Sequence, residues 1–359
     1  MKVLITGGAG FIGCNTAKRF LDRGDEVMVL DNLSRHQAQI ANVNWLKALN
    51  KNLQFVKGDI RDHGLLRTLF RENDFDAVIH LAAQTAVTTS VVDPRMDFEV
   101  NALGSFNLLE AIREEKRDPA IIYASTNKVY GGMEEVGIVE RNGRYEYADL
   151  PNGVAESRTL DFHSPYGCSK GAADQYMIDY SRIYGLRTVT MRQSCIYGYR
   201  QFGMEDQGWI AWFTIAVVTG KPFVIYGDGK QVRDVLFIDD LIDLYELALA
   251  KIDTCAGQMF NVGGGPDNCV SLLETIAMLE ELVGRRLPYN MAEWRPGDQR
   301  VFVCDYSKAR AAFGWVPRVG PAVGIKQLYK WIVDNQSLFS NTNGAMHSAA
   351  LELAESEQR

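Results

Sequence analysis

A glycine-rich turn at Thr6–Gly13 sets the narrowest limits on how this chain of 359 residues can fold. Before the turn, Lys2–Thr6 is a short apolar run typical of a strand, and after it Phe11–Arg23 has apolar residues at helical spacing. Glycines in such a turn let the backbone bend tightly and let phosphates approach the free N–H groups that begin the helix. The predicted ligand contacts in this turn are Gly7, Gly10, Phe11, Ile12 and Gly13.

The alternation of strands and helices continues through the first half of the chain. The predicted strands are Lys2–Thr6, Glu26–Asp31, Leu53–Asp59, Asp76–Ala83, Ala120–Ser125 and Arg187–Arg192. Helices are predicted at Phe98–Glu115 and Tyr166–Tyr184. Strands separated by helices form parallel sheets that are covered on both faces. The expected fold is therefore α/β, a doubly wound parallel sheet of the Rossmann type.

The pattern loosens after about residue 185, where aromatic, glycine and charged residues intermix. We expect a dinucleotide-binding domain at residues 1–184 and a smaller, mixed α/β C-terminal domain at 185–334 that holds the substrate. Residues 235–250 are expected to return to the first domain. The last stretch, 335–359, is rich in Ser, Asn, Ala and Glu and is expected to form a mobile tail.

An acidic residue at the end of the second predicted strand indicates which dinucleotide is bound. A carboxylate at Asp31 can accept hydrogen bonds from the adenosine ribose and repel a 2′-phosphate, which favours NAD over NADP. Arg35 argues the other way, because an arginine nearby can accommodate that phosphate, but Asp31 carries more weight. The other predicted cofactor contacts are Asn32, Ser34, Arg35, Asp59, Ile60, Leu81, Ala82, Ala83, Gln84, Asn101 and Ser125.

A tyrosine and a lysine four residues apart, Tyr166 and Lys170, are the candidate proton-transfer pair. On a helix, residues at i and i+4 share one face. An ammonium beside a phenol favours the phenolate, so Tyr166 is expected to have a lowered pKa and to act as a base. Beside a nicotinamide, such a base takes a hydroxyl proton while hydride leaves the same carbon. Taken alone, the pair also fits an ordinary surface contact.

The overall composition excludes several other classes of protein. The net charge of −7 argues against a nucleic-acid-binding protein, because such proteins carry a basic face. The six cysteines are scattered without a Cys-x-x-Cys pair, so we expect reduced thiols and no metal site. The apolar run Trp209–Val218 is too short to span a bilayer, and no signal peptide precedes the first strand. A cytoplasmic protein without a membrane partner is expected.

Several motifs together resemble the extended short-chain dehydrogenase/reductases that act on nucleotide sugars. The matching segments are Thr6–Gly13, Asp59–Ile60, His80–Ala83, Asn101–Ala111, Val129–Gly131 and Tyr166–Lys170. The resemblance runs from residue 1 to about 334. It implies a catalytic triad of Thr126, Tyr166 and Lys170, a tightly held NAD, and a nucleoside diphosphate sugar in the second domain. It also implies that Lys170 hydrogen-bonds the nicotinamide ribose.

Asn127 and Lys128 distinguish this chain from two other groups of that superfamily. In the related 4,6-dehydratases, the catalytic Thr is followed by an Asp-Glu pair that supplies the acid and base for loss of water. Asn127 and Lys128 occupy those places here, and the glutamate that the related decarboxylases carry in this segment is absent too. The remaining site can oxidise and re-reduce a hydroxyl-bearing carbon.

Longer segments are similar to the CDP-paratose 2-epimerases, also called CDP-tyvelose 2-epimerases. These segments are Ser125–Gly131, Pro151–Gly153, Leu160–Met177 and Asp206–Phe213. The similarity implies inversion at C2 of a CDP-linked dideoxyhexose, with Tyr166 as the base and a 2-keto sugar as the intermediate. Because NADH returns the hydride to the sugar, no net oxidation occurs and NAD need not leave.

The substrate contacts implied by this resemblance are Thr126, Asn127, Tyr166, Arg200, Arg233, Arg295 and Asp298. Arginines suit the diphosphate because guanidinium groups bind phosphate through two parallel hydrogen bonds. Cys195 stands where many relatives have Asn, which leaves that contact undefined. Three alternatives stay open: a nucleotide-sugar 4-epimerase, a 2-epimerase of another sugar such as GDP-mannose, and a dinucleotide-sensing regulator. Relatives also lead us to expect a homodimer or homotetramer, formed through the helix faces at Phe98–Glu115 and Gln175–Tyr184.

Overall fold

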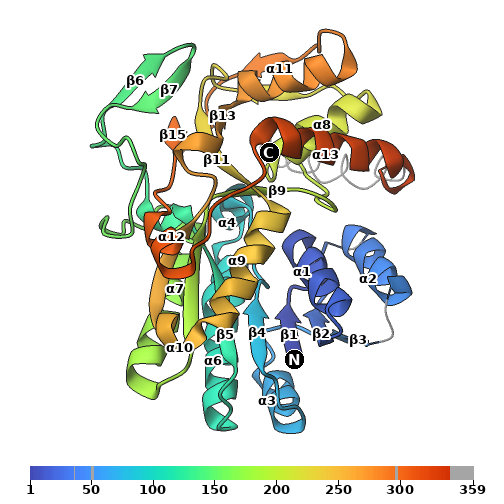
Figure 1. Cartoon of the computed structure of the whole chain (residues 1–359), viewed down its shortest axis with the longest axis vertical. Helices are drawn as coiled ribbons and strands as arrows, with labels where there is room; N and C mark the ends of the chain where they lie inside the picture. Colours follow the sequence, from blue (N-terminus) through green and yellow to red (C-terminus); the bar gives the residue numbers. More distant parts are fainter. Residues whose placement is uncertain (36, 50–51, 296–297, 340–359) are drawn as a thin grey trace, which may run out of the picture.

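A seven-stranded parallel sheet forms the centre of the computed structural model, which describes residues 1–35, 37–49, 52–295 and 298–339 (Figure 1). The order across the sheet is β12–β8–β5–β4–β1–β2–β3, so the direction of winding reverses between β1 and β4. Ligands of such sheets bind beyond the carboxyl ends of the strands at this reversal. The strands are β1 (Lys2–Thr6), β2 (Glu26–Asp31), β3 (Leu53–Lys57), β4 (Ala77–His80), β5 (Ala120–Thr126), β8 (Thr188–Gln193) and β12 (Gln258–Val262).

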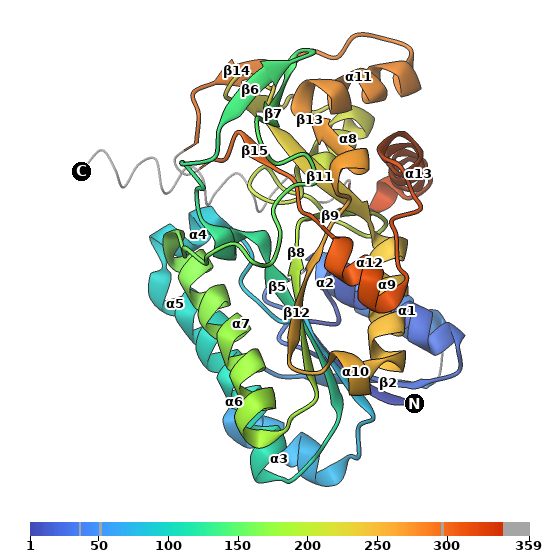
Figure 2. The same cartoon turned by 60° about the vertical axis from the view of Figure 1, so that its left-hand side comes forward.

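Helices cover both faces of this sheet (Figure 2). On one side are α1 (Phe11–Asp22), α2 (Gln37–Leu49), α9 (Ile238–Ala250), α10 (Ile252–Cys255) and α12 (Ser307–Phe313). On the other are α3 (His63–Glu72), α4 (Val87–Val92), α5 (Pro94–Phe98), α6 (Gly104–Glu114) and α7 (Ser164–Tyr184). Successive strand residues point to opposite faces. Val3 and Ile5 therefore join the core under α1, while Leu4 joins the separate core under α6 and α7.

A smaller group of elements lies beyond the carboxyl ends of the strands (Figure 1). Its sheets are β9 (Cys195–Tyr197), β11 (Val232–Phe237), β13 (Cys269–Ser271) and β15 (Val301–Phe302); β10 (Val224–Tyr226) with β14 (Asn290–Ala292); and the hairpin of β6 (Ile138–Arg141) and β7 (Arg144–Tyr147). Its helices are α8 (Trp209–Thr219), α11 (Leu272–Val283) and α13 (Pro321–Asp334), with short turns η3 (Pro266–Asn268) and η4 (Gln336–Leu338). Helices α8 and α13 pack against each other.

The predicted doubly wound parallel sheet is confirmed, and β1 and β2 have the predicted bounds. Two predicted strands are shorter at their carboxyl ends, because β3 stops at Lys57 and β4 at His80. The residues that follow each strand form loops at the edge where ligands bind. Strand β12 and the hairpin β6–β7 were not predicted.

The helix predicted as continuous over Phe98–Glu115 is interrupted, so that prediction is wrong in detail. A π-helical turn, η1 (Glu99–Leu103), separates α5 from α6. At Gly104 an added Cβ would lie 2.6 Å from the Ile60 side chain, so the helix packs closely on the loop after β3. Apolar spacing carries no signal for such a turn, because the interruption changes backbone hydrogen bonds and leaves the side-chain pattern nearly intact.

The main sheet takes strands from both sides of residue 184, since β8 and β12 follow that point in the chain. Helix α9, which lies in the segment expected to return to the sheet, contacts α1 and β5. No helix in the described part of the chain is both long enough and apolar enough to cross a membrane. Of the stretch predicted to form a mobile tail, residues 340–359 lie outside the described residues.

Candidate active site

The glycine turn is tightly folded at the carboxyl end of β1. Gly7 has φ +68°, and its N–H donates to Leu30 O at 2.8 Å. A Cβ added at Gly13 would lie 2.4 Å from Gly7 O, so α1 begins in close contact with the turn. Gly10 precedes the first residue of α1 and supplies no side-chain cap. The first N–H groups of α1 are therefore available for an anion, as a pyrophosphate requires.

Asp31 is held against this turn from the end of β2. Its Oδ2 accepts from the N–H of Ala9 at 3.0 Å, and its Oδ1 accepts from the N–H of Leu33 at 2.8 Å and from Gln39 at 3.0 Å. Burial raises the pKa of this carboxyl, and the backbone hydrogen bonds and the nearby Arg35 oppose that shift. Arg35 itself donates to Thr85 Oγ1 at 2.5 Å. Asp31 and Arg35, which argue for NAD and NADP respectively, therefore lie close together.

The other predicted cofactor residues gather at the same edge of the sheet. Asn32 donates to Asp59 Oδ2 at 2.9 Å, which links the ends of β2 and β3. Hydrogen bonds from Arg61 are the main reason that the pKa of Asp59 falls to about 2, against the opposing effect of burial. After β4, the N–H of Ala82 donates to Thr6 Oγ1 at 3.2 Å, beside the glycine turn. Ile60 is buried, Leu81 and Ala83 are half-buried, and Ser34 donates its N–H to Asn32.

The predicted triad is brought together by β5 and α7. Thr126 ends β5, and its hydroxyl is close enough to Tyr166 on α7 to lower the pKa of that phenol. Lys170, one turn further along α7, donates from Nζ to Ala124 O at 2.6 Å and lies 4.3 Å above the ring of Tyr123. Pro165 lies in the first turn of α7, where its missing N–H costs nothing. Thr126 Oγ1 also donates to Asn127 Oδ1 at 3.3 Å.

The pKa values of the pair correct one part of the sequence argument. Burial raises the pKa of Tyr166 to about 12, and the hydrogen bond with Thr126 opposes that shift. Burial also lowers the pKa of Lys170 to about 7, although the Asp174 and Asp97 carboxylates oppose it. The expected lowering of the phenol pKa by Lys170 is therefore wrong for this arrangement, because burial raises that pKa and Lys170 donates to Ala124 O instead.

A buried network behind the triad was missed by sequence reasoning. The carboxylate of Asp97, fully buried at the end of α5, accepts from Ser169 Oγ and from Asn101 Nδ2, the latter at 3.1 Å. Asn101 lies in the π-helical turn and accepts at Oδ1 from the N–H of Gln84 at 2.8 Å. The negative charge of Asp97 raises the pKa of both Tyr166 and Lys170. In the sequence, the one indication of this network was the four-residue spacing of Asp97 and Asn101, which is typical of two residues on one helix face.

A second buried acid, Asp174, lies near Lys170 and raises the pKa of its ammonium. Arg192 on β8 forms two hydrogen bonds with the Asp174 carboxylate, at 2.9 and 3.0 Å, and both side chains are inaccessible to solvent. Ser125 donates to Asp174 Oδ2 at 2.6 Å. The hydroxyl of Ser125, predicted to contact the cofactor, is therefore committed to this ion pair.

The predicted substrate residues fall into two groups. Arg233 on β11 pairs with Asp298 at 2.9 Å, while Arg295 lies 3.8 Å above the ring of Tyr226 on β10. Both pairs belong to the smaller group of elements above the sheet. Arg200 is elsewhere, because it stacks on Trp45 at 3.8 Å and donates to Asn42 Oδ1 at 3.0 Å.

The contacts of Arg200 connect it to the glycine turn, and its role as a substrate contact stays a prediction. Asn42 donates in turn to Ala9 O at 3.0 Å, so Arg200 supports the glycine turn from the side of α2. The residue has φ +59°, an uncommon backbone conformation for a side chain of this size. Neighbouring Tyr199 accepts at its carbonyl from Asn15 Nδ2 at 2.8 Å, which fixes the same segment to α1.

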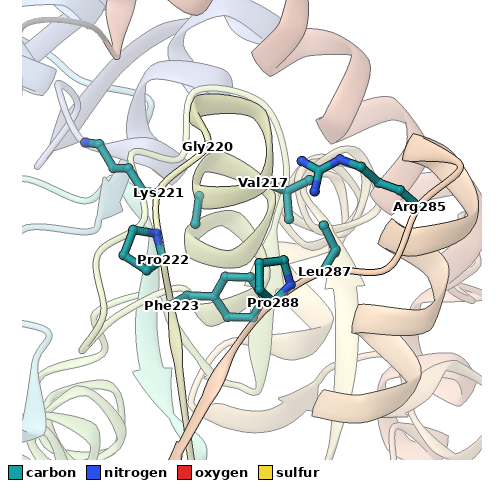
Figure 3. A pocket seen from close by; sticks show the side chains of 9 residues that line it. Val217, Gly220, Lys221, Pro222, Phe223, Arg285, Leu287 and Pro288 are labelled. Carbon is teal, nitrogen blue, oxygen red and sulfur yellow. The ribbon is translucent and has the colours of Figure 1, made fainter.

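A surface pocket of about 210 Å³ lies between the end of α8 and the segment 285–288 (Figure 3). It is lined by Ala216, Val217, Gly220, Lys221, Pro222, Phe223, Arg285, Leu287 and Pro288. Figure 3 shows Lys221 and Arg285 on opposite sides, with Phe223 and Pro288 between them. None of the predicted catalytic, cofactor or substrate residues lines this pocket. The candidate active site is therefore the carboxyl edge of the main sheet, where the predicted cofactor and catalytic residues lie.

The sheet order, the glycine turn with Asp31 and the Thr–Tyr–Lys group define the extended short-chain dehydrogenase/reductase class, as predicted. The family described as GDP-mannose 4,6 dehydratase matches residues 4–328, and the chain belongs to this family. It is 48% identical to the CDP-paratose 2-epimerase of Salmonella typhi over 92% of this chain and 99% of that protein.

Solved structures give the same classification. UDP-glucose 4-epimerase of Thermotoga maritima with UDP-glucose superposes with a TM-score of 0.81 at 30% identity, covering 94% of this chain and 100% of that one. UDP-glucuronic acid 4-epimerase of Bacillus cereus, solved with UDP-glucuronic acid and NAD, has a TM-score of 0.80 at 30% identity, covering 93% and 100%. Complexes of this kind confirm NAD as the cofactor that was predicted.

The residues at the edge of the sheet also fit a dinucleotide. Side chains at Gly7 and Gly13 would collide with backbone atoms at 2.7 and 2.4 Å, so the turn stays free of side chains that would keep phosphates away. Asp31 ends β2, the position at which a carboxylate can accept hydrogen bonds from ribose hydroxyls. Tyr166 and Lys170 belong to α7, which covers the face of the sheet opposite α1 (Figure 2). The candidate residues for phosphate binding, ribose binding and proton transfer therefore all lie at the carboxyl edge of the sheet.

Proposed function

We propose that this protein is a nucleotide-sugar epimerase that inverts C2 of a CDP-linked dideoxyhexose, in the manner of CDP-paratose and CDP-tyvelose interconversion. The observation that carries the proposal is the buried Thr126–Tyr166–Lys170 group with Asn127 and Lys128 in place of an acid–base pair. That site can move a hydroxyl proton but lacks the groups for elimination of water. The 48% identity to a CDP-paratose 2-epimerase supports C2 as the carbon.

In the proposed mechanism, Tyr166 and Thr126 handle the proton of the C2 hydroxyl. Burial raises the pKa of Tyr166 to about 12, so without cofactor the phenol is protonated. As a phenolate it would accept the proton of the C2 hydroxyl and later return that same proton to the product oxygen. When bound, NAD supplies the hydride acceptor and donor, and its nicotinamide charge favours the phenolate. Lys170 donates to Ala124 O, and its proposed role is to hydrogen-bond the nicotinamide ribose. Rotation of the 2-keto sugar between the two hydride transfers inverts the carbon.

The proposed binding residues follow from the same placement. The glycine turn holds the pyrophosphate, Asp31 the adenosine ribose, and Asp59 with Ile60 the adenine side. Arg233, Arg295 and Asp298 are proposed to hold the diphosphate of the substrate, so residues 185–334 supply the nucleotide-sugar site. Arginine suits this role because its guanidinium binds phosphate oxygens in pairs.

Product stereochemistry tests the proposal directly. The protein is incubated in D2O with CDP-paratose, CDP-tyvelose, GDP-mannose and UDP-glucose, and each sugar is followed by NMR. We expect C2 inversion of the CDP sugars and NAD(H) released from the protein on denaturation. Inversion at C4 of UDP-glucose instead would establish the alternative 4-epimerase, and binding of NAD without any turnover would favour the dinucleotide-sensing regulator.

We also propose that the protein is a homodimer that pairs through α4, α5 and α7. Large apolar side chains are exposed on these helices: Val91, Val92, Phe98, Tyr176, Ile183 and Tyr184. Helix α7 contacts both α4 and α5, so these side chains belong to neighbouring helices. Exposed apolar groups of this extent mark interaction surfaces.

Light scattering checks the dimer. The wild type is expected to have twice the 40.2-kDa mass of one chain, and Phe98→Asp to shift it toward a single chain. Val323→Asp, on the exposed side of α13, is the control and should leave the mass unchanged. A wild-type mass of one chain would contradict the dimer, and four chains would indicate the homotetramer.

The free thiol state of all six cysteines supports the proposed cytoplasmic location.

A further inference from the structure

Lys128 lies between the proton-transfer group and the smaller group of elements above the sheet. It belongs to η2 (Asn127–Tyr130), a 3₁₀ turn whose first residues are fixed by the hydrogen bond from the Lys128 N–H to Thr126 Oγ1 at 3.2 Å. Its side chain extends away from the strand, and Nζ donates to Gln299 Oε1 at 3.2 Å. The backbone of Lys128 therefore lies at Thr126, and its ammonium lies one side-chain length away at Gln299.

Two consecutive residues hold two cations at this place. Gln299 binds Lys128, and the preceding Asp298 pairs with Arg233 at 2.9 Å. Gln299 is buried and donates from Nε2 to Gly131 O at 2.5 Å, which fixes its amide oxygen toward the lysine. In this cluster of Lys128, Arg233, Asp298 and Gln299, one carboxylate faces two positive charges.

The electrostatic state of Lys128 fits an anion-binding role. Burial, followed by the neighbouring Arg233 cation, lowers the pKa of Lys128 to about 8, while Asp298 on the loop and Cys195 on β9 oppose the shift. A partly desolvated cation next to a second cation is costly unless an anion is supplied. An anionic phosphate group between the two would replace lost hydration with charge-assisted hydrogen bonds.

We propose that Lys128 binds the sugar-linked phosphate of the substrate and thereby directs oxidation to the carbon next to it. The inference rests on the proposed function and deepens it. In a nucleoside diphosphate sugar the phosphate is attached at C1, which neighbours C2, whereas C4 lies across the ring. A cation one side-chain length from Thr126 suits a reacting carbon adjacent to the phosphate. The same cation would be far from the phosphate if C4 faced Tyr166.

The proposal makes Lys128 a specificity-determining residue and differs from a role in proton transfer. Loss of its charge should weaken binding of any ligand that carries the phosphate, including one without a sugar. Cytidine, which has no phosphate, should be unaffected. Because only the protonated amine binds the phosphate, affinity should fall as the pH rises above about 8.

Calorimetric titration of the NAD-loaded protein with CDP tests the proposal. Lys128→Gln is expected to bind CDP roughly 10- to 100-fold more weakly at pH 7, the size of effect usual for a hydrogen bond to a charged group. Lys326→Gln, on the exposed face of α13, is the charge-matched control and should bind like the wild type. Between pH 7 and 9.5 the wild type should lose affinity, and Lys128→Gln should change little.

Equal CDP affinity of Lys128→Gln and wild type at pH 7 would overturn the proposal. If the variant does not fold, the wild-type titration decides alone, because affinity that stays constant from pH 7 to 9.5 would equally overturn it. Failure of the proposed function has a different signature. In that case CDP binding still depends on Lys128, but the wild type inverts no C2 centre.

Discussion

At the scale of single residues, burial decides the behaviour of the titratable groups at the edge of the sheet. Tyr166, Lys170 and His80 are all shifted toward their neutral forms, because each is removed from water. The sequence indicated Tyr166 and Lys170 by their spacing, which follows from helix geometry. The lowered pKa that it indicated for Tyr166 was wrong, because desolvation depends on the packing of β5, α5 and α7 around the pair.

Removal of the Tyr166 hydroxyl should stop turnover without loss of the cofactor. In Tyr166→Phe we expect the rate of epimerisation to fall by roughly 10²- to 10⁴-fold, the usual contribution of a positioned acid–base group. The amount of NAD(H) released per chain on denaturation should equal that of the wild type. Tyr329→Phe on α13 serves as the control. Activity near the wild-type level in Tyr166→Phe would show that another group transfers the proton.

His80 should make the protein sensitive to acid. It is fully buried between Thr6 and Ser105, at 2.6 and 3.0 Å, and burial lowers its pKa to about 3. A folded pKa below the unfolded value of about 6.5 means that the unfolded state binds more protons, so stability falls as the pH drops through 6.5 toward 3.

The variant His80→Asn lacks this titration and measures its size. Between pH 7 and 5 the wild type should lose about 2 kcal/mol of unfolding free energy that His80→Asn does not lose. Urea unfolding at both pH values gives the comparison. Parallel losses in the two proteins would mean that His80 is protonated in the folded state at pH 5.

At the scale of elements, the site is formed by the loops and helix ends that follow the strands. The sequence predicted β1, the glycine turn and α1 well, because glycine positions, apolar strand residues and helical spacing agree there. It missed the π-helical turn that positions Asn101, since that interruption leaves the apolar pattern intact. Strand β12 was missed because Gln258–Val262 has neither a continuous apolar run nor a clear alternation of polar and apolar residues.

The close packing of the glycine turn gives a prediction at this scale. In Gly13→Ala the added Cβ would lie 2.4 Å from Gly7 O, so the start of α1 must move and NAD retention should be lost. Gly64→Ala is the matched control, because its Cβ would meet only the Asp62 side chain at 3.4 Å. It should retain NAD and gain up to about 1 kcal/mol from higher helix propensity. Equal NAD content in both variants would contradict this role of the turn.

At the scale of the whole molecule, the chain joins a dinucleotide sheet to a smaller group of elements through shared segments. Arg200 shows a connection of this kind that the sequence did not indicate. Its motif resembles a substrate contact, but the residue packs on Trp45 and supports the glycine turn through Asn42. The long-range partners of a side chain depend on how distant segments meet, which local patterns do not specify. Arg233 and Asp298, in contrast, meet as a pair above the sheet.

Transient oxidation at C2 is tested most directly by the fate of the hydrogen on that carbon. CDP-paratose carrying deuterium at C2 is converted in ordinary water, and the product is examined by NMR and mass spectrometry. Hydride transfer to bound NAD and back predicts CDP-tyvelose that keeps the deuterium at C2. Product with hydrogen from water at C2 would show that the carbon is inverted by deprotonation, and oxidation by NAD would then be the wrong mechanism.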